Sequence, residues 1–156
     1  MKKILIALLC ILTLISGCTK NEQPNKDEVA KVEEDTVVSF KGVGDNLIHS
    51  SIFWDAEKED GTYDFTKMYK SVKKDMKNAD IAFINQETML GGTQLGLSGY
   101  PCFNSPQEIA KNLKDTGFNL VNLATNHSMD KFQIGINNTL EAFREQKKMI
   151  FDGIYD

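Results

Sequence analysis

Residues 118–130 read FNLVNLATNHSMD, an apolar run that ends abruptly in polar side chains. The run over residues 118–124 predicts a β-strand of the kind that is buried in a sheet. The polar cluster after it offers the amide oxygen of Asn126, an imidazole nitrogen of His127 and the carboxylate of Asp130. Such groups bind metal ions and phosphates. A buried strand that ends in potential ligands therefore predicts a functional site at the end of that strand.

Two earlier apolar runs end in the same way. Residues 37–43 predict a strand that leads into Asp45, and residues 81–84 predict a short buried strand that leads into residues 85–87, which read Asn-Gln-Glu. Residues 149–151 are apolar and can begin a fourth strand. Three strands that each end in potential ligands indicate one shared site.

Helical patterns separate these strands. An apolar periodicity over residues 65–76 predicts one helix, a capping box over residues 105–108 predicts the start of a second, and a periodicity over residues 136–143 predicts a third. We expect residues 46–64 to be irregular and the glycine-rich residues 91–99 to form a mobile lip. The alternation of strands and helices predicts an α/β fold with a parallel sheet and right-handed crossovers.

Bulk composition places the chain among ordinary globular proteins. It has 156 residues, which suits one domain, and 41% of them are hydrophobic and 26% charged. The formal net charge is −4 and no basic tract occurs, which argues against nucleic acid as a partner.

The N-terminus resembles a targeting segment. Two lysines precede an apolar stretch over residues 4–15, which is shorter than the about 20 residues that span a bilayer. Small residues then precede Cys18, as in the lipobox of bacterial lipoproteins. We expect residues 1–17 to be a lipoprotein signal peptide, Cys18 to carry lipid and residues 18–36 to be a flexible tether. The alternatives are a plain signal peptide or a buried N-terminal helix.

This interpretation locates the protein at the extracytoplasmic face of the cell membrane, held there by its lipid anchor. It also leaves Cys102 as the only other cysteine of the mature chain, so no internal disulfide is expected. Cys102 has no histidine near it in sequence and is interpreted as a packing residue rather than a nucleophile.

The carboxyl ends of parallel strands are where α/β proteins bind ligands. The side chains that fall there are Asp45, Asn85, Glu87, Asn126 and His127. Mixed oxygen and imidazole ligands suit Mn²⁺, Fe²⁺, Zn²⁺ or Mg²⁺, and such an ion would polarise a phosphoryl or carbonyl oxygen.

Each of these residues also has a structural explanation. Asp45 can initiate a turn, Glu87 can be a surface charge, His127 can be structural, and Asp130 can cap the following helix. His49, four residues after Asp45, is the weakest member and is interpreted as a loop histidine. The coincidence of so many such residues at one sheet edge favours the site.

Four short motifs stand in order along the chain: Gly44-Asp45, Asn85-Gln86-Glu87, Phe103-Asn104-Ser105-Pro106, and residues 124–130, which read ATNHSMD. Together they resemble the CapA family of capsule synthesis, or poly-γ-glutamate synthesis, proteins over residues 37–156. The resemblance implies an α/β sandwich like that of the calcineurin-like metallophosphoesterases, with a divalent metal ion. It implies Asp45, Glu87, Asn126 and His127 as metal ligands, and Asn126, His127 and Asp130 as catalytic candidates, with Asp130 behind the ligands rather than among them.

Two departures from the family pattern stand within these motifs. Thr125 replaces the first Asn of the usual Asn-Asn-His motif, and Lys131-Phe132 stands where an aromatic residue and Gly are frequent. Later family motifs, of the His-Trp-Gly-x-Glu and Gly-His-His-Pro-His types, do not occur in this sequence. We therefore expect residues 37–156 to be the N-terminal part of such a domain, truncated after about three βα units, with an incomplete site and little or no activity of its own.

The resulting expectation is a membrane-anchored protein that takes part in the synthesis or export of a capsule polymer of the poly-γ-glutamate type. Expected partners are the membrane and subunits of a polymer synthase. Two alternatives remain open: a non-catalytic scaffold of the polymer synthase, and a solute-binding lipoprotein.

Overall fold

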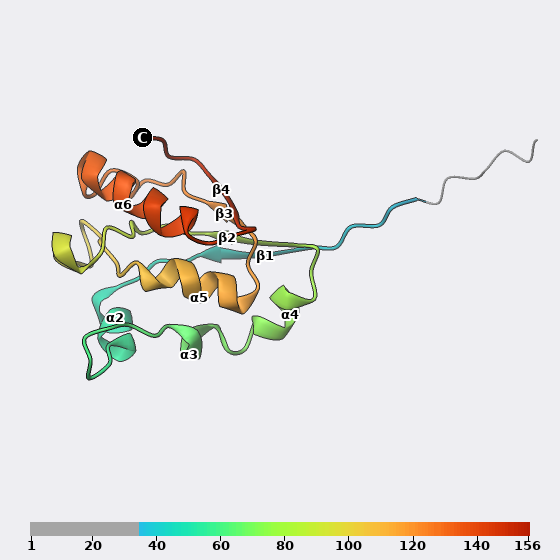
Figure 1. Cartoon of the computed structure of the whole chain (residues 1–156), viewed down its shortest axis with the longest axis horizontal. Coiled ribbons are helices and arrows are strands. Elements are labelled where there is room, and N and C mark those ends of the chain that lie inside the picture. Colours follow the sequence, from blue (N-terminus) through green and yellow to red (C-terminus); the bar gives the residue numbers. More distant parts are fainter. Residues whose placement is uncertain (1–34) are drawn as a thin grey trace, which may run out of the picture. The chain divides into compact units, whose positions relative to one another are not determined.

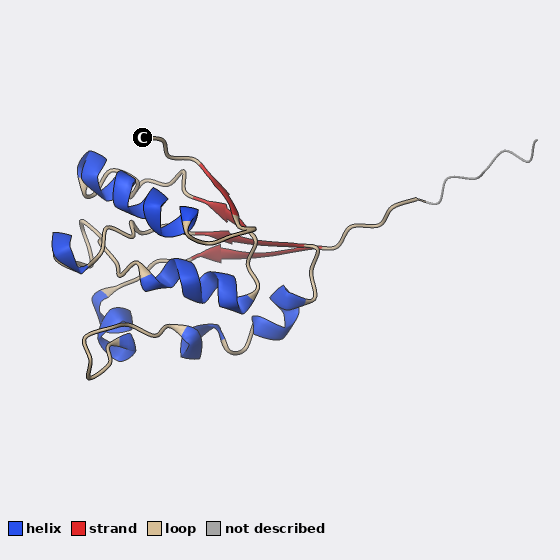
Figure 2. Ribbon diagram, in the orientation of Figure 1, coloured by secondary structure: helices blue, strands red, loops and turns tan. Residues whose placement is uncertain are grey.

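A computed structural model describes residues 35–156, and within it Val37–Asp156 forms one compact unit. The signal peptide, Cys18 and nearly all of the tether lie outside the described residues, so those expectations stay predictions. Figures 1 and 2 show the unit as a small sheet with helices packed on it. The elements in chain order are β1 (Phe40–Asp45), α2 (Ser50–Ala56), α3 (Thr66–Tyr69), α4 (Lys73–Lys77), β2 (Ile81–Asn85), η1 (Thr93–Leu95), α5 (Glu108–Thr116), β3 (Leu120–Asn122), α6 (Phe132–Arg144) and β4 (Ile150–Asp152).

The four strands form a single sheet in the order β1-β2-β3-β4, and every neighbouring pair is parallel. Because each strand pairs with the next one along the chain, every crossover passes over the sheet and brings the carboxyl ends to one edge. The predicted α/β class is confirmed, and the arrangement agrees with part of a calcineurin-like metallophosphoesterase fold.

One face of the sheet packs against the helices. Ala82, Ile84 and Val121 point to this face and are buried. The ring of Phe143 from α6 lies 5.5 Å from that of Phe151 in β4, measured between ring centroids. Helices α5 and α6 contact each other over this face (Figure 2). Burying these side chains is the main stabilising contribution to the unit.

The opposite face of the sheet is much less covered. Phe40 and Ile150, on the two edge strands, are 61% and 67% exposed, while Phe83 and Leu120 between them are half-buried. Phe40 stacks on Phe83 with 6.2 Å between ring centroids. Parallel sheets are normally covered on both faces. In the part of the chain that the structure describes, this second face of the sheet is therefore left largely uncovered.

The prediction of one continuous helix over residues 65–76 is wrong. The structure has two short helices, α3 and α4, joined by tight turns in which Lys70 N–H bonds to Lys67 O and Val72 N–H to Tyr69 O. Such i→i+3 bonds interrupt the α-helical ladder. The expectation that residues 46–64 are irregular is also wrong, because α2 lies within them.

The predicted capping box over residues 105–108 does not form. Helix α5 begins at Glu108 without a side-chain cap, and the buried hydroxyl of Ser105 bonds to that of Thr88 at 3.0 Å. The lip predicted at residues 91–99 is held at its base, since Gly91 and Gly92 are buried and the Asn104 amide donates to the carbonyls of Gly92 and Gly96.

Candidate functional site at the carboxyl edge of the sheet

Strand register places four polar residues in one row across the carboxyl edge. Asp45 pairs with Asn85, Asn85 with Asn122, and Asn122 with Asp152. The Asn122 amide donates to Asn85 Oδ1 at 2.6 Å, and the Asn85 amide donates to Asp45 Oδ1 at 2.6 Å. The shared edge predicted for Asp45 and Asn85 is therefore present in the structure. Asn122 and Asp152 also lie at this edge because of the strand register, which no sequence motif predicts.

At the far end of this row, Asp152 is held as a carboxylate. The Tyr155 hydroxyl donates to Asp152 Oδ1 at 2.6 Å and the Gly153 N–H at 2.7 Å. The bond from Tyr155 is the main cause that lowers the pKa of Asp152, because a hydrogen bond to the charged form favours that form.

The loop after β3 is built by its own short polar side chains. The Thr125 hydroxyl donates to the carbonyl of Glu87 at 2.9 Å and so fastens this loop to the end of β2. Ser128 Oγ accepts the Thr125 N–H at 2.9 Å and lies 2.8 Å from the carbonyl of Leu123. Thr125, the residue that departs from the family motif, thus has a definite structural role here.

That loop holds His127 against Asp130. His127 Nδ1 lies 2.7 Å from Asp130 Oδ2, and the same oxygen accepts the Phe103 N–H at 2.7 Å. Both side chains are 14% exposed. Because a carboxylate only accepts, we assign the proton to Nδ1, which leaves Nε2 for a ligand. Asp130 does not cap the next helix, whose N-cap is Lys131; it orients His127 instead.

The remaining predicted ligands differ in how far they are exposed. Asp45 and Asn126 are exposed and Glu87 is half-buried. Within residues 35–156, no three His, Cys, Asp or Glu side chains converge closely enough to hold a metal ion. Asp45, Glu87 and His127, three of the four ligands that the resemblance implies, therefore do not converge on one point in this part of the chain. Assignment of Asp45, Glu87, Asn126 and His127 as metal ligands stays a prediction.

A network of hydrogen bonds between buried polar groups lies next to the carboxyl edge of the sheet. The Tyr69 hydroxyl donates to Asn46 Oδ1 at 3.0 Å, the Asn46 amide donates to Gln86 Oε1 at 2.6 Å, and the Gln86 amide donates to the carbonyl of Thr88 at 2.8 Å. The Thr88 hydroxyl then accepts from Ser105. Burial raises the pKa of Tyr69, so its hydroxyl stays a donor. This network, which sequence analysis missed, joins residues next to Asp45 and Glu87.

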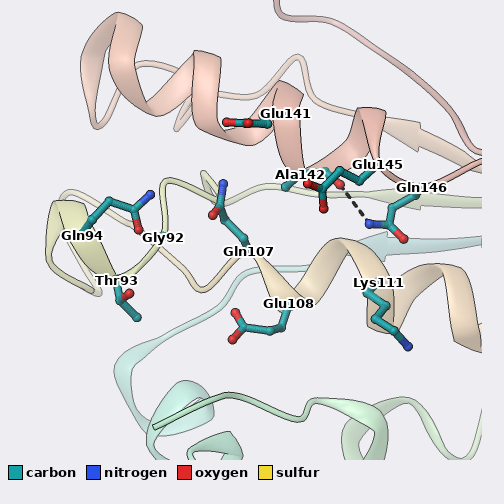
Figure 3. Close-up of a pocket in the computed structure, with 10 residues that line it drawn as sticks. All are labelled: Gly92, Thr93, Gln94, Gln107, Glu108, Lys111, Glu141, Ala142, Glu145 and Gln146. Atoms are coloured by element: carbon teal, nitrogen blue, oxygen red, sulfur yellow. Dashed lines mark hydrogen bonds between the residues drawn. The ribbon is translucent and has the colours of Figure 1, made fainter.

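The structure has a hollow beside the carboxyl edge of the sheet and a groove elsewhere. One, of about 410 Å³, is lined mainly by apolar side chains and opens beside Asp45. The other is a polar groove of about 450 Å³ (Figure 3). Its lining comes from the loop at Gly92 and from α5 and α6, and none of the predicted site residues lines it. The groove in Figure 3 is thus separate from the carboxyl edge.

Comparisons with known proteins agree with the motifs. No helix within residues 35–156 has the length and apolarity needed to cross a membrane. None of the curated proteins compared with the chain matches it. A family model described as bacterial capsule synthesis protein PGA_cap matches residues 39–156, which is most of the chain and includes every element of the fold. The chain belongs to the bacterial capsule synthesis protein family.

Proposed function

We propose that this protein acts in the synthesis or export of a capsule polymer of the poly-γ-glutamate type, and that the carboxyl edge of its sheet binds the polymer or its precursor. Membership of the capsule synthesis family supports a role in making or exporting the polymer. The row of polar residues, together with the imidazole–carboxylate pair of His127 and Asp130, supports the carboxyl edge as the binding site.

The observation that carries the proposal is the orientation of His127. Asp130 fixes one imidazole nitrogen, while within residues 35–156 the other makes no hydrogen bond. A histidine held in this way presents its free nitrogen to a ligand as an acceptor. We assign to the described residues binding and orientation of a ligand, because a three-ligand metal cluster is not among them.

The alternative function left open by the sequence is a scaffold of the polymer synthase that uses this fold without turnover. Metal analysis of the purified full chain distinguishes a scaffold from a hydrolase. A scaffold needs no bound metal ion, whereas a hydrolase of the metallophosphoesterase type contains a divalent ion in stoichiometric amount.

The proposal includes a location. A lipid on Cys18 would hold the protein at the outer face of the cell membrane, and residues 18–36 would lift the sheet from the lipid surface. Radiolabelled fatty acid should be incorporated into the wild-type protein and not into a Cys18→Ala variant. Equal labelling of the two proteins would contradict lipid attachment at this residue.

Deletion of the gene in a capsule-forming host tests the process itself. Capsule polymer is released from the cells, hydrolysed and measured as glutamate. We expect the deletion to lower the polymer content and the wild-type gene to restore it. An unchanged content in the deletion strain would refute the proposed function.

A further inference from the structure

Large apolar side chains are exposed on each of the three connections that leave the carboxyl edge of the sheet. Trp54 lies in α2, after β1; Tyr100 follows β2; and Met129 and Phe132 follow β3. Their exposed fractions range from 59% for Met129 to 80% for Tyr100. Single exposed apolar side chains are common on protein surfaces, whereas several on neighbouring loops indicate an interaction surface. We call these four side chains the apolar rim.

The first two of these connections are in close contact. Gly99, next to Tyr100, lies so near to α2 that an added Cβ would be 2.7 Å from Ser50 Oγ. Trp54 follows Ser50 by one helical turn and therefore lies on the same side of α2.

The third connection is fastened to the other two at Phe103. The Phe103 N–H donates to Asp130 Oδ2 at 2.7 Å, two residues before Phe132. Its buried ring lies 4.6 Å from that of His127 and 5.1 Å from that of His49, measured between centroids. The apolar rim therefore belongs to loops that are held to one another at one end of the fold.

The backbone of Phe132 is strained. Its φ angle is 53°, in the left-handed region that bulky residues rarely adopt. The strain brings little packing in return, because most of the ring stays exposed. Strained residues of this kind gather at functional sites, where the conformation places a side chain for use. The ring of Phe132 is thus displayed at a cost in stability.

We propose that the apolar rim inserts into the surface of the membrane and turns the carboxyl edge of the sheet towards the bilayer. This inference rests on the proposed function, since it uses the lipid anchor at Cys18. It brings the proposed binding site to the membrane across which the polymer is exported.

The chemistry of the rim favours lipid as its partner. Tryptophan and tyrosine are the residues that gather at the boundary between water and a bilayer, because one end of each ring system is apolar and the other polar. The rim lines neither the hollow beside Asp45 nor the polar groove in Figure 3, so it offers an exposed surface rather than a cleft for a peptide or polymer chain. An anchor at Cys18 would keep this surface at a high effective concentration near lipid, so that a few side chains suffice.

Fluorescence of Trp54 tests the proposal, because the chain has 1 tryptophan and the signal reports on the rim alone. The full lipidated chain is reconstituted in vesicles of phosphatidylcholine and phosphatidylglycerol, with or without bromine on the acyl chains next to the headgroup. Bromine quenches a tryptophan that it contacts, so we expect weaker emission in the brominated vesicles. Equal emission in the two kinds of vesicle would overturn the proposal, and it is the result expected if the rim docks on a protein that the vesicles lack.

Substitution then tests the role of the strained ring. Phe132→Asn removes the ring and keeps a residue that tolerates positive φ, so its urea midpoint should be no lower than that of the wild type. Loss of one buried aromatic side chain should lower the ratio of inserted to free rim about tenfold, and with it the quenching of Trp54.

Phe40→Ser provides the control, because Phe40 is also an exposed aromatic residue but lies on the uncovered face of the sheet. It should leave the quenching of Trp54 unchanged. Unchanged quenching in Phe132→Asn, or an equal loss of quenching in Phe40→Ser, would overturn the proposal. Failure of the proposed function shows separately, in the polymer content of the deletion strain.

Discussion

Replacing Gln86 by Met tests whether the buried polar network holds the carboxyl edge. Gln86 is 1% exposed, and Met has a similar volume, so the change removes hydrogen bonds with little change in packing. The Asn46 amide loses its acceptor and the Thr88 carbonyl loses its donor. Each buried group left unpaired costs about 1–3 kcal/mol, so we expect the two groups together to lower the free energy of unfolding by about 2–6 kcal/mol. This is a large share of the about 5–15 kcal/mol that stabilises a typical domain.

Urea unfolding of the full chain, followed by circular dichroism at equilibrium, measures this loss. Gln133→Met provides the matched control, because Gln133 is exposed on α6 and bonds only to Asn137 one turn along the helix. The control should stay within about 0.5 kcal/mol of the wild type. If Gln86→Met also stays within that range, with an unchanged denaturant slope, the network does not hold the edge.

Three further changes test other parts of the structure. Asp130→Ala should speed hydrogen exchange of the Phe103 amide about tenfold, because its acceptor is lost; unchanged protection would contradict the contact. Bonds from the hydroxyl and N–H of Ser39 lower the pKa of Asp80, so Asp80 contributes stability that is present above the ordinary carboxyl pKa and lost as pH falls through the lowered one. When urea titrations are repeated at several pH values, the free energy of unfolding of Asp80→Asn should fall less with acid than that of the wild type. The same pH dependence in both proteins would contradict this contribution of Asp80. Phe40 belongs to the uncovered face of the sheet, so Phe40→Ser should lower the fluorescence of a bound hydrophobic dye. The decrease should exceed that caused by removing an exposed apolar side chain on α2. Equal decreases would contradict dye binding at the uncovered sheet face.

The strands and the shared edge were predictable because both follow from local patterns. Residues 81–84 and residues 118–124 are short apolar runs that end in polar residues, and the parallel order follows from the helices between them. The strand bounds were less accurate: β3 covers only Leu120–Asn122, although Phe118 and Leu123 on either side are buried.

Features that depend on contacts between distant residues could not be predicted. Ser105 has the sequence of a helix cap, but Thr88 competes for its hydroxyl in the buried network. Asp130 likewise looks like a cap, and its actual partners, Phe103 and His127, come together only in the folded chain. The contact of His49 with Phe103 spans more than 50 residues, so periodicity and motif spacing carry no signal for it.

The central claim is that the carboxyl edge, with His127 as its key side chain, is the working part of this capsule synthesis protein. Complementation of the deletion strain with His127→Gln tests it most directly, with Gln133→Met as the control and immunoblots to match protein levels. We predict that His127→Gln leaves the polymer content at the level of the deletion strain, while the control restores it. Full restoration by His127→Gln at equal protein level would contradict the claim.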